Sequence, residues 1–223
     1  MIREALDALR KGEMVLLYDF DNRERETDLT MRSDRITHRD ICRMRHDAGG
    51  LICTAIPFAS AKKLGLPFAR DVLRNCAMVE QLGDIPYDPS NNSSFSLWVN
   101  HRNTFTGITD KDRSLTVNAL SQVVQNTLDG EPVLFKDQFR TPGHMPVLIA
   151  AEKLLDQRHG QTELSVAMAE MAGINPTISI CEMLDDESGL ALSKEEAIRY
   201  AKKHGLVFVE GSEVLEEWDN RQT

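Results

Sequence analysis

A short apolar run that ends in a dense cluster of acids is the feature that most limits how this chain can fold. Met14–Tyr18 contains no charged side chain and follows Gly12, a pattern typical of a buried strand rather than a helix. Five carboxylates follow within ten residues, offset by two arginines. The acids are Asp19, Asp21, Glu24, Glu26 and Asp28, and the arginines are Arg23 and Arg25. Strand-like alternation returns at residues 27–31, so we expect the acidic segment to lie between two ordered strands.

The surplus of negative charge in this segment indicates a site for a divalent cation, because oxygen-rich acidic sites suit such ions. A solvated charged loop is the alternative that the residue types leave open. Such a loop needs turn-forming residues, yet Asn22 is the only strong one between residues 19 and 28. We therefore expect a cation site at the end of the first strand.

Size and charge narrow the classes of protein that remain. The 223 residues, 41% of them hydrophobic, are enough for a full core and predict one domain over residues 1–223. A net charge of −9 argues against a general nucleic-acid binder or an anionic-membrane binder, so a phosphate ligand needs a local pocket. No apolar stretch reaches transmembrane length and the first residues do not resemble a signal peptide, so we expect a cytoplasmic protein.

The four cysteines show neither a C-x-x-C pair nor the spacing of a zinc site. They are Cys42, Cys53, Cys76 and Cys181. Reduced thiols are the simplest interpretation, and most of these cysteines have apolar neighbours that suit burial.

Signals for strands and helices alternate along the whole chain, which predicts an α/β (α+β) fold, an α-β-α layered sandwich over a mixed sheet. Further strands are expected near 51–56, 94–99, 177–181 and 206–209. Helices are expected near 2–11, 38–48, 61–64, 115–128, 147–159, 163–171, 194–204 and 212–218. Residues 84–92 are expected to form a surface loop, and 139–146 an irregular loop because they hold two prolines and a glycine. The order of the strands does not follow from these patterns.

Two further side chains suit proton transfer. His144 follows Pro142-Gly143, and an imidazole has a pKa that suits acid-base catalysis near neutral pH, although a lone loop histidine is usually a surface residue. Glu182 stands at the end of an expected buried strand, where a carboxylate is either paired structurally or functional.

The segment from Arg158 to Thr162 joins two expected helices and suits a phosphate group. A guanidinium offers paired donors, while a hydroxyl and free backbone N–H groups at a helix N-terminus add more. An ordinary corner between helices is the alternative.

Taken together, these segments resemble the 3,4-dihydroxy-2-butanone 4-phosphate synthase family. The acidic segment matches its R-E-x-E-x-D motif through Arg23, Glu24, Glu26 and Asp28. Other matches are G-G-L-I-C at 49–53, T-G-I-x-x-x-D-R at 106–113, P-G-H at 142–144, R-x-G-x-T at 158–162 and I-C-E at 180–182. The specificity of the resemblance lies in the occurrence of all six, in order, between Lys11 and about His204.

The resemblance implies a magnesium-dependent lyase of riboflavin biosynthesis, in its single-domain form and with the family's fold, which resembles that of YrdC-like proteins. The implied reaction converts D-ribulose 5-phosphate to formate and L-3,4-dihydroxy-2-butanone 4-phosphate by enediol formation, dehydration, skeletal rearrangement and release of C4. Two Mg²⁺ ions are implied, with Mn²⁺ as an alternative. The resemblance also implies a homodimer with active sites near the subunit interface.

The resemblance assigns roles to residues one by one. Proton transfer falls to His144 and Glu182. Substrate contacts at the sugar are assigned to Arg23, Glu24, Asp28, Cys53 and Thr106. Further substrate contacts are assigned to the segment that suits a phosphate group, through Arg158, Gly160, Gln161 and Thr162. Glu24 is the implied metal ligand.

Two of these assignments have a specific difficulty. Gln161 stands where the family has a metal-ligating histidine, which puts the second protein ligand in doubt, although an amide oxygen is acceptable to Mg²⁺. For Cys53, a buried core thiol is nearly as good an interpretation as contact with substrate, because nothing in the sequence lowers its pKa.

Two rival functions share part of this pattern. Another metal-dependent pentose-phosphate isomerase or aldolase would use the same enediol chemistry, but without releasing formate. A YrdC-like nucleotide-binding or RNA-binding module would need a basic stripe that this acidic chain does not have.

Overall fold

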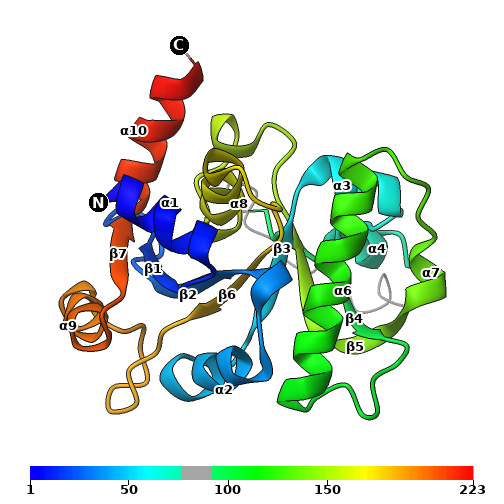
Figure 1. The fold of residues 1–223 in the computed structure, drawn as a ribbon, viewed down its shortest axis with the longest axis horizontal. Coiled ribbons are helices and arrows are strands. Elements are labelled where there is room, and N and C mark those ends of the chain that lie inside the picture. Colours follow the sequence, from blue (N-terminus) through cyan, green and yellow to red (C-terminus); the bar gives the residue numbers. More distant parts are fainter. Residues whose placement is uncertain (77–91, 223) are drawn as a thin grey trace.

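The computed structural model describes residues 1–76 and 92–222. In these residues seven strands form one mixed sheet in the order β4-β5-β3-β6-β2-β1-β7 (Figure 1). The strands are β1 (Val15–Tyr18), β2 (Thr27–Arg32), β3 (Cys53–Ile56), β4 (Phe95–His101), β5 (Phe139–Ile149), β6 (Ile178–Glu182) and β7 (Val207–Glu210). The β1–β7 and β3–β5 pairs are parallel, and the other four pairs are antiparallel.

Helices cover both faces of this sheet (Figure 1). They are α1 (Ile2–Lys11), α2 (His38–Asp47), α3 (Phe58–Leu64), α4 (Ala69–Arg74), α6 (Asp110–Leu128), α7 (Phe135–Gln138), α8 (Gln161–Ala172), α9 (Lys194–His204) and α10 (Gly211–Gln222). Two 3₁₀ turns, η1 (Ser33–Arg35) and η2 (Leu154–Asp156), complete the described elements. No helix in the described part of the chain has the length and apolar character that a membrane span requires.

Strand alternation divides the core between the two faces. Leu16 packs in the cluster formed with α2 and α9, whereas Leu17 packs in the cluster formed with α1, α8 and α10. Successive side chains of a strand point to opposite faces, so each strand contributes to both clusters. The predicted α-β-α fold over a mixed sheet is confirmed.

The expected irregular loop at 139–146 and helix at 147–159 were wrong, because residues 139–149 form one strand, β5. Val147 and Ile149 are buried in parallel pairing with β3, and a short buried apolar run does not distinguish strand from helix by its spacing. Gly143 allows the backbones of β5 and β4 to approach closely, because an added Cβ would lie 2.1 Å from the carbonyl carbon of Val99. The surface loop expected at 84–92 lies, except for Asn92, outside the described residues.

Candidate active site

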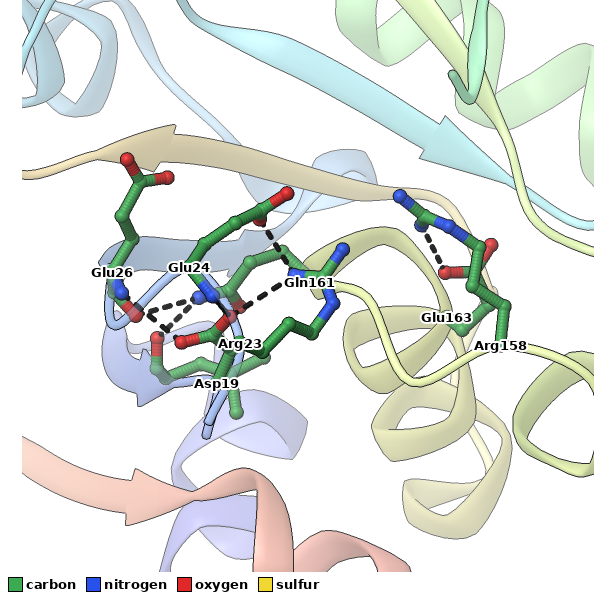
Figure 2. A network of polar contacts seen from close by, with 8 residues as sticks. Asp19, Arg23, Glu24, Glu26, Arg158, Gln161 and Glu163 are labelled. Atoms are coloured by element: carbon green, nitrogen blue, oxygen red, sulfur yellow. Dashed lines mark hydrogen bonds and ion pairs between the residues drawn. The ribbon is translucent and has the colours of Figure 1, made fainter. Parts of the chain in front are cut away.

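The acidic segment between β1 and β2 is organised by the buried carboxylate of Asp19. Asp19 Oδ2 accepts the backbone N–H of Glu24 and Oδ1 accepts that of Glu26, each at 3.0 Å (Figure 2). Arg23 Nη1 donates to Asp19 Oδ2 at 3.0 Å and also pairs with the Glu24 carboxylate at 2.6 Å. Hydrogen bonds to a charged group contribute about 1.5–3 kcal/mol each, so Asp19 fixes the backbone that carries Glu24.

A pocket opens between this segment, the N-terminus of α8 and the strand ends. Its lining includes six of the predicted site residues. Polar lining is contributed by Arg23, Glu24, Glu26, Arg158, Gln161, Thr162, Glu182, Ser93 and Ser94, and apolar lining by Phe95, Leu148 and Ile180. The acidic segment, the predicted phosphate segment and the end of β6 therefore meet at one place.

Strand pairing explains why Glu182 and Asp28 lie together. Asp28 in β2 stands opposite Glu182 in β6, and Cys53 in β3 stands opposite Ile180. Ile180 packs in the core cluster beneath α8. Alternate residues of a strand point to the same face, so Glu182 and its partner Asp28 also point towards α8. Asp28 is fully buried, and neither of its carboxylate oxygens has a hydrogen-bond partner among the described residues.

Burial and mutual repulsion shift these carboxyl groups towards their neutral forms. Burial, followed by the charge of Glu182, raises the pKa of Asp28 well above its usual value. Burial is also the main cause that raises the pKa of Glu26 and of Glu182, and the charge of Glu24 adds to both. A low-dielectric site crowded with acids disfavours their ionisation, and a bound cation would relieve it.

The residues of the pocket fit a hard divalent cation. Buried oxygens without hydrogen-bond partners are present on Asp28 and Gln161, and Glu24 lines the same pocket as Gln161. Among residues 1–76 and 92–222, no three acidic, histidine or cysteine side chains converge as a complete ligand set. The carboxylate of Glu24 and the amide oxygen of Gln161 are oxygen donors of the kind that Mg²⁺ accepts, since it usually takes one or two carboxylates and completes its shell with water and substrate oxygens.

The start of α8 is built around an ion pair. Arg158 Nη1 donates to the buried Glu163 carboxylate at 2.5 Å (Figure 2). Glu163 Oε1 also accepts the backbone N–H of Ala151 at 2.9 Å. A Cβ at Gly160 would lie 2.1 Å from Arg158 Nη1, so only glycine leaves room for the pair. Thr162 is buried in the first turn, where backbone N–H groups of a helix can bind an anion.

Cys53 does not line this pocket. Burial, followed by the charges of Glu182 and Asp28, raises the pKa of its thiol well above the usual value. The thiol is therefore neutral at neutral pH, as the buried-core alternative requires. Its contact with substrate stays a prediction.

His144 and Thr106 belong to a second cluster around Asn100. The backbone N–H of His144 donates to Asn100 Oδ1 at 2.8 Å, and Asn100 Nδ2 lies 3.1 Å from His144 Nδ1. A Cβ at Gly107 would lie 2.1 Å from Asn100 Nδ2, so the glycine beside Thr106 packs closely against the same side chain. Asp112 holds this turn by accepting the backbone N–H groups of Thr106 and Gly107.

The second cluster is separate from the pocket within one chain. Neither His144 nor Thr106 lines the cavity that contains Glu24. Leu148, which does line it, is four residues further along β5 from His144, or about 13 Å in an extended strand. The structure thus brings six predicted residues together in the pocket and leaves His144 and Thr106 in the second cluster. Asp28, Cys53 and Gly160 do not line the pocket either, although each is adjacent in sequence or in strand pairing to residues near it.

Three residues that organise the pocket and the second cluster were not singled out by their sequence patterns. Glu163 resembles an ordinary favourable acid in the first turn of a helix, and Asn100 an ordinary polar position in an alternating strand. Asp19 was counted only as one acid of the cluster. Its position immediately after a buried strand was the available signal, because a carboxylate held at that point must be paired.

Comparison with known proteins is consistent with this geometry. The family model described as 3,4-dihydroxy-2-butanone 4-phosphate synthase matches residues 3–217. The protein of that name from Methanosarcina mazei is 52% identical over 223 residues, covering 96% of this chain and 90% of that protein. The one from Archaeoglobus fulgidus is 51% identical over 222 residues, covering 96% and 92%.

A solved structure supports the same fold. A 3,4-dihydroxy-2-butanone 4-phosphate synthase crystallised in complex with two magnesium ions superposes with a TM-score of 0.82 at 24% identity, covering 99% of this chain and 97% of that one. The match of the family model to nearly the whole chain, with relatives above 50% identity, shows that the chain belongs to the 3,4-dihydroxy-2-butanone 4-phosphate synthase family.

Proposed function

We propose that this chain converts D-ribulose 5-phosphate to L-3,4-dihydroxy-2-butanone 4-phosphate and formate in riboflavin biosynthesis. The observation that carries the proposal is the single pocket in which the acidic segment, the end of β6 and the start of α8 meet. The pocket joins acidic groups that suit enediol chemistry to an arginine and a helix N-terminus that suit a phosphate.

The chain's own residues divide the work of binding and proton transfer. Arg158 and the first turn of α8, including Thr162, hold the phosphate. Arg23 orients the sugar hydroxyls from the lining of the pocket, whereas Asp28 is buried opposite Glu182, and its contact with the sugar stays a prediction. Glu182 carries protons during enediol formation and dehydration, and the raised pKa of its half-buried carboxyl group brings it closer to neutrality, where acid-base catalysis is most effective.

Mg²⁺ is the cofactor we propose, with Glu24 and the amide oxygen of Gln161 as its protein ligands. When bound, the ion would polarise the substrate carbonyl and stabilise negative charge on adjacent oxygens. The relative crystallised with two magnesium ions supports a pair of ions. Mn²⁺ is an alternative with similar oxygen-ligand chemistry.

We also propose a homodimer in which the second cluster of one subunit completes the pocket of the other. His144 and Thr106 lie outside the pocket of their own chain. Phe105 and Ile108, in the same turn, are 95% and 51% exposed, an unusual position for large apolar side chains that a partner surface would cover. His144 would then transfer protons in the partner's pocket, with Asn100 orienting its ring.

Formate release is the measurement that tests the reaction, because isomerases and aldolases acting on pentose phosphates do not produce it. We expect the purified chain with ribulose 5-phosphate and Mg²⁺ to release one formate per substrate. EDTA and Glu24→Gln are each expected to reduce the rate about a hundredfold or more, since metal stabilisation contributes several kcal/mol. Isomerised pentose phosphate without formate would sink the proposal in favour of its rival.

A further inference from the structure

Gln161, the first residue of α8, makes contacts that a metal ligand alone does not require. Its side chain is 7% exposed. Gln161 Nε2 donates one hydrogen bond to the carbonyl oxygen of Leu17 at 3.1 Å and another to that of Glu26 at 3.0 Å. Leu17 lies near the end of β1 and Glu26 directly before β2, so one amide group holds both ends of the acidic segment.

The chemistry of these two contacts fixes which way the amide points. Both partners are carbonyl oxygens, which only accept hydrogen bonds, so the NH₂ group must face them. The reverse orientation would place Gln161 Oε1 against two oxygens. Gln161 Oε1 therefore points away from both carbonyls, and it is buried without a hydrogen-bond partner among the described residues.

No other short side chain can make the same pair of bonds. A neutral imidazole has a single N–H and could donate to only one of the two carbonyls. A glutamate in its ionised form has no donor and would repel both. An asparagine has the same group on a chain one methylene shorter.

We propose that Gln161 is a positioning residue whose amide clasps the acidic segment, residues 19–26, to α8 in the absence of any metal ion. The backbone of the segment is already closed by Asp19, which donates its N–H to Glu26 O at 3.1 Å and accepts two N–H groups with its carboxylate. Gln161 adds the attachment to a neighbouring element. The two ends of the Gln161 amide therefore have separate roles. The NH₂ group orders the acidic segment through its two hydrogen bonds, while Gln161 Oε1 remains available to a metal ion.

Hydrogen exchange of the Glu24 and Glu26 backbone amides tests the clasp without requiring activity or metal. In EDTA we expect these amides to exchange slowly in the parent protein and at least tenfold faster in Gln161→Glu. Gln122→Glu is the matched control, because Gln122 lies on the exposed face of α6 and touches neither the pocket nor the segment. The control should leave the rates of both amides unchanged.

The amides of α6 report whether a variant remains folded, and Gln161→His provides a second variant. We expect the histidine variant to exchange faster than the parent in EDTA and to regain protection with Mg²⁺. The parent should show similar protection in both conditions. The clasp is excluded if Gln161→Glu and Gln161→His both match the parent in EDTA, or if the parent itself gains tenfold protection when Mg²⁺ is added.

The clasp is a property of the protein without metal or substrate, so it is independent of the proposed reaction. If the protein released no formate, the hydrogen-exchange result would still support the clasp. If the variants showed no difference in hydrogen exchange, the proposed reaction would be unaffected.

Discussion

Arg158 and His144 are expected to affect different kinetic constants. Arg158→Ala should raise KM for ribulose 5-phosphate about 10–100-fold with a smaller change in kcat, because charge-assisted hydrogen bonds to a phosphate act in the ground state and the transition state alike. His144→Ala should lower kcat about 10²–10⁴-fold, the usual contribution of a proton carrier. Steady-state kinetics of both variants check the assignment, and the opposite pattern would reverse the two roles.

Arg158→Lys is the control for the first of these variants. Removing the guanidinium leaves the Glu163 carboxylate buried, whereas lysine keeps a positive charge near it. A rise in KM in the lysine variant without loss of stability would therefore report the lost fork of donors rather than a damaged helix.

Asp28 should make the stability of the metal-free protein depend on pH. Its raised folded-state pKa means that the folded state retains a proton that the unfolded state releases from about pH 4 upwards. Stability is therefore expected to fall as pH rises from about 4 through the raised pKa, and the loss is complete only above that pKa. Asp28→Asn should remove this dependence of the free energy of unfolding on pH. The amide can also change the free energy of unfolding by a constant amount, but that change does not depend on pH.

Urea unfolding in EDTA between pH 4 and 9 compares the slopes of the two proteins. Glu182 contributes a slope of the same sign, since burial raises its pKa as well. Parallel curves for parent and Asp28→Asn would show that Asp28 ionises normally in the folded state.

At the scale of elements, local patterns were sufficient wherever a strand or helix carried its own boundary signals. The acidic segment was expected between two strands, and the strands Val15–Tyr18 and Thr27–Arg32 enclose it. The error at β5 has a different origin, because Val147–Ile149 is defined by its neighbours β3 and β4 rather than by its own spacing. Pairing between distant strands, which also sets Asp28 opposite Glu182, is not encoded in any local pattern.

The same limit applies to the site. Glu24, Arg158, Gln161 and Glu182 were predicted and line one pocket. The separation of His144 from them could not be predicted, because it depends on which end of β5 faces the pocket. The partners Glu163 and Asn100 were missed because each has an ordinary local role as well.

Gly160 gives a test at the start of α8. Gly160→Ala should push the Arg158 guanidinium away from Glu163, raising KM about tenfold and lowering the free energy of unfolding by about 1–3 kcal/mol, the cost of an unsatisfied buried group. In an Arg158→Ala background there is no guanidinium to displace, so the same change should cost less. Equal costs in both backgrounds would mean that the glycine serves another purpose.

At the scale of the whole molecule, sharing of sites between subunits can be tested with two inactive variants. Glu24→Gln and His144→Ala chains, carrying different tags, are co-expressed and the mixed dimer is isolated. If each pocket uses its own Glu24 and the partner's His144, one of the two pockets is intact and about half of the parent activity should return. A mixed dimer as inactive as the two single variants would show that each pocket takes both Glu24 and His144 from the same chain. The single-domain organisation and the cytoplasmic location stay predictions.

The pairing of Arg158 with Glu163 also bears on the order in which ligands arrive. Arg158 pairs with Glu163, and Arg23 pairs with Asp19 and Glu24, so both arginines in the described lining are already matched by carboxylates. Glu26 and Glu182 line the same pocket and leave it with an excess of acidic groups. A doubly charged phosphate ester approaching such a cavity is repelled until a cation has entered. Binding should therefore be sequential, with the metal first, so that calorimetric titration of ribulose 5-phosphate gives no heat in EDTA while Mg²⁺ alone still binds.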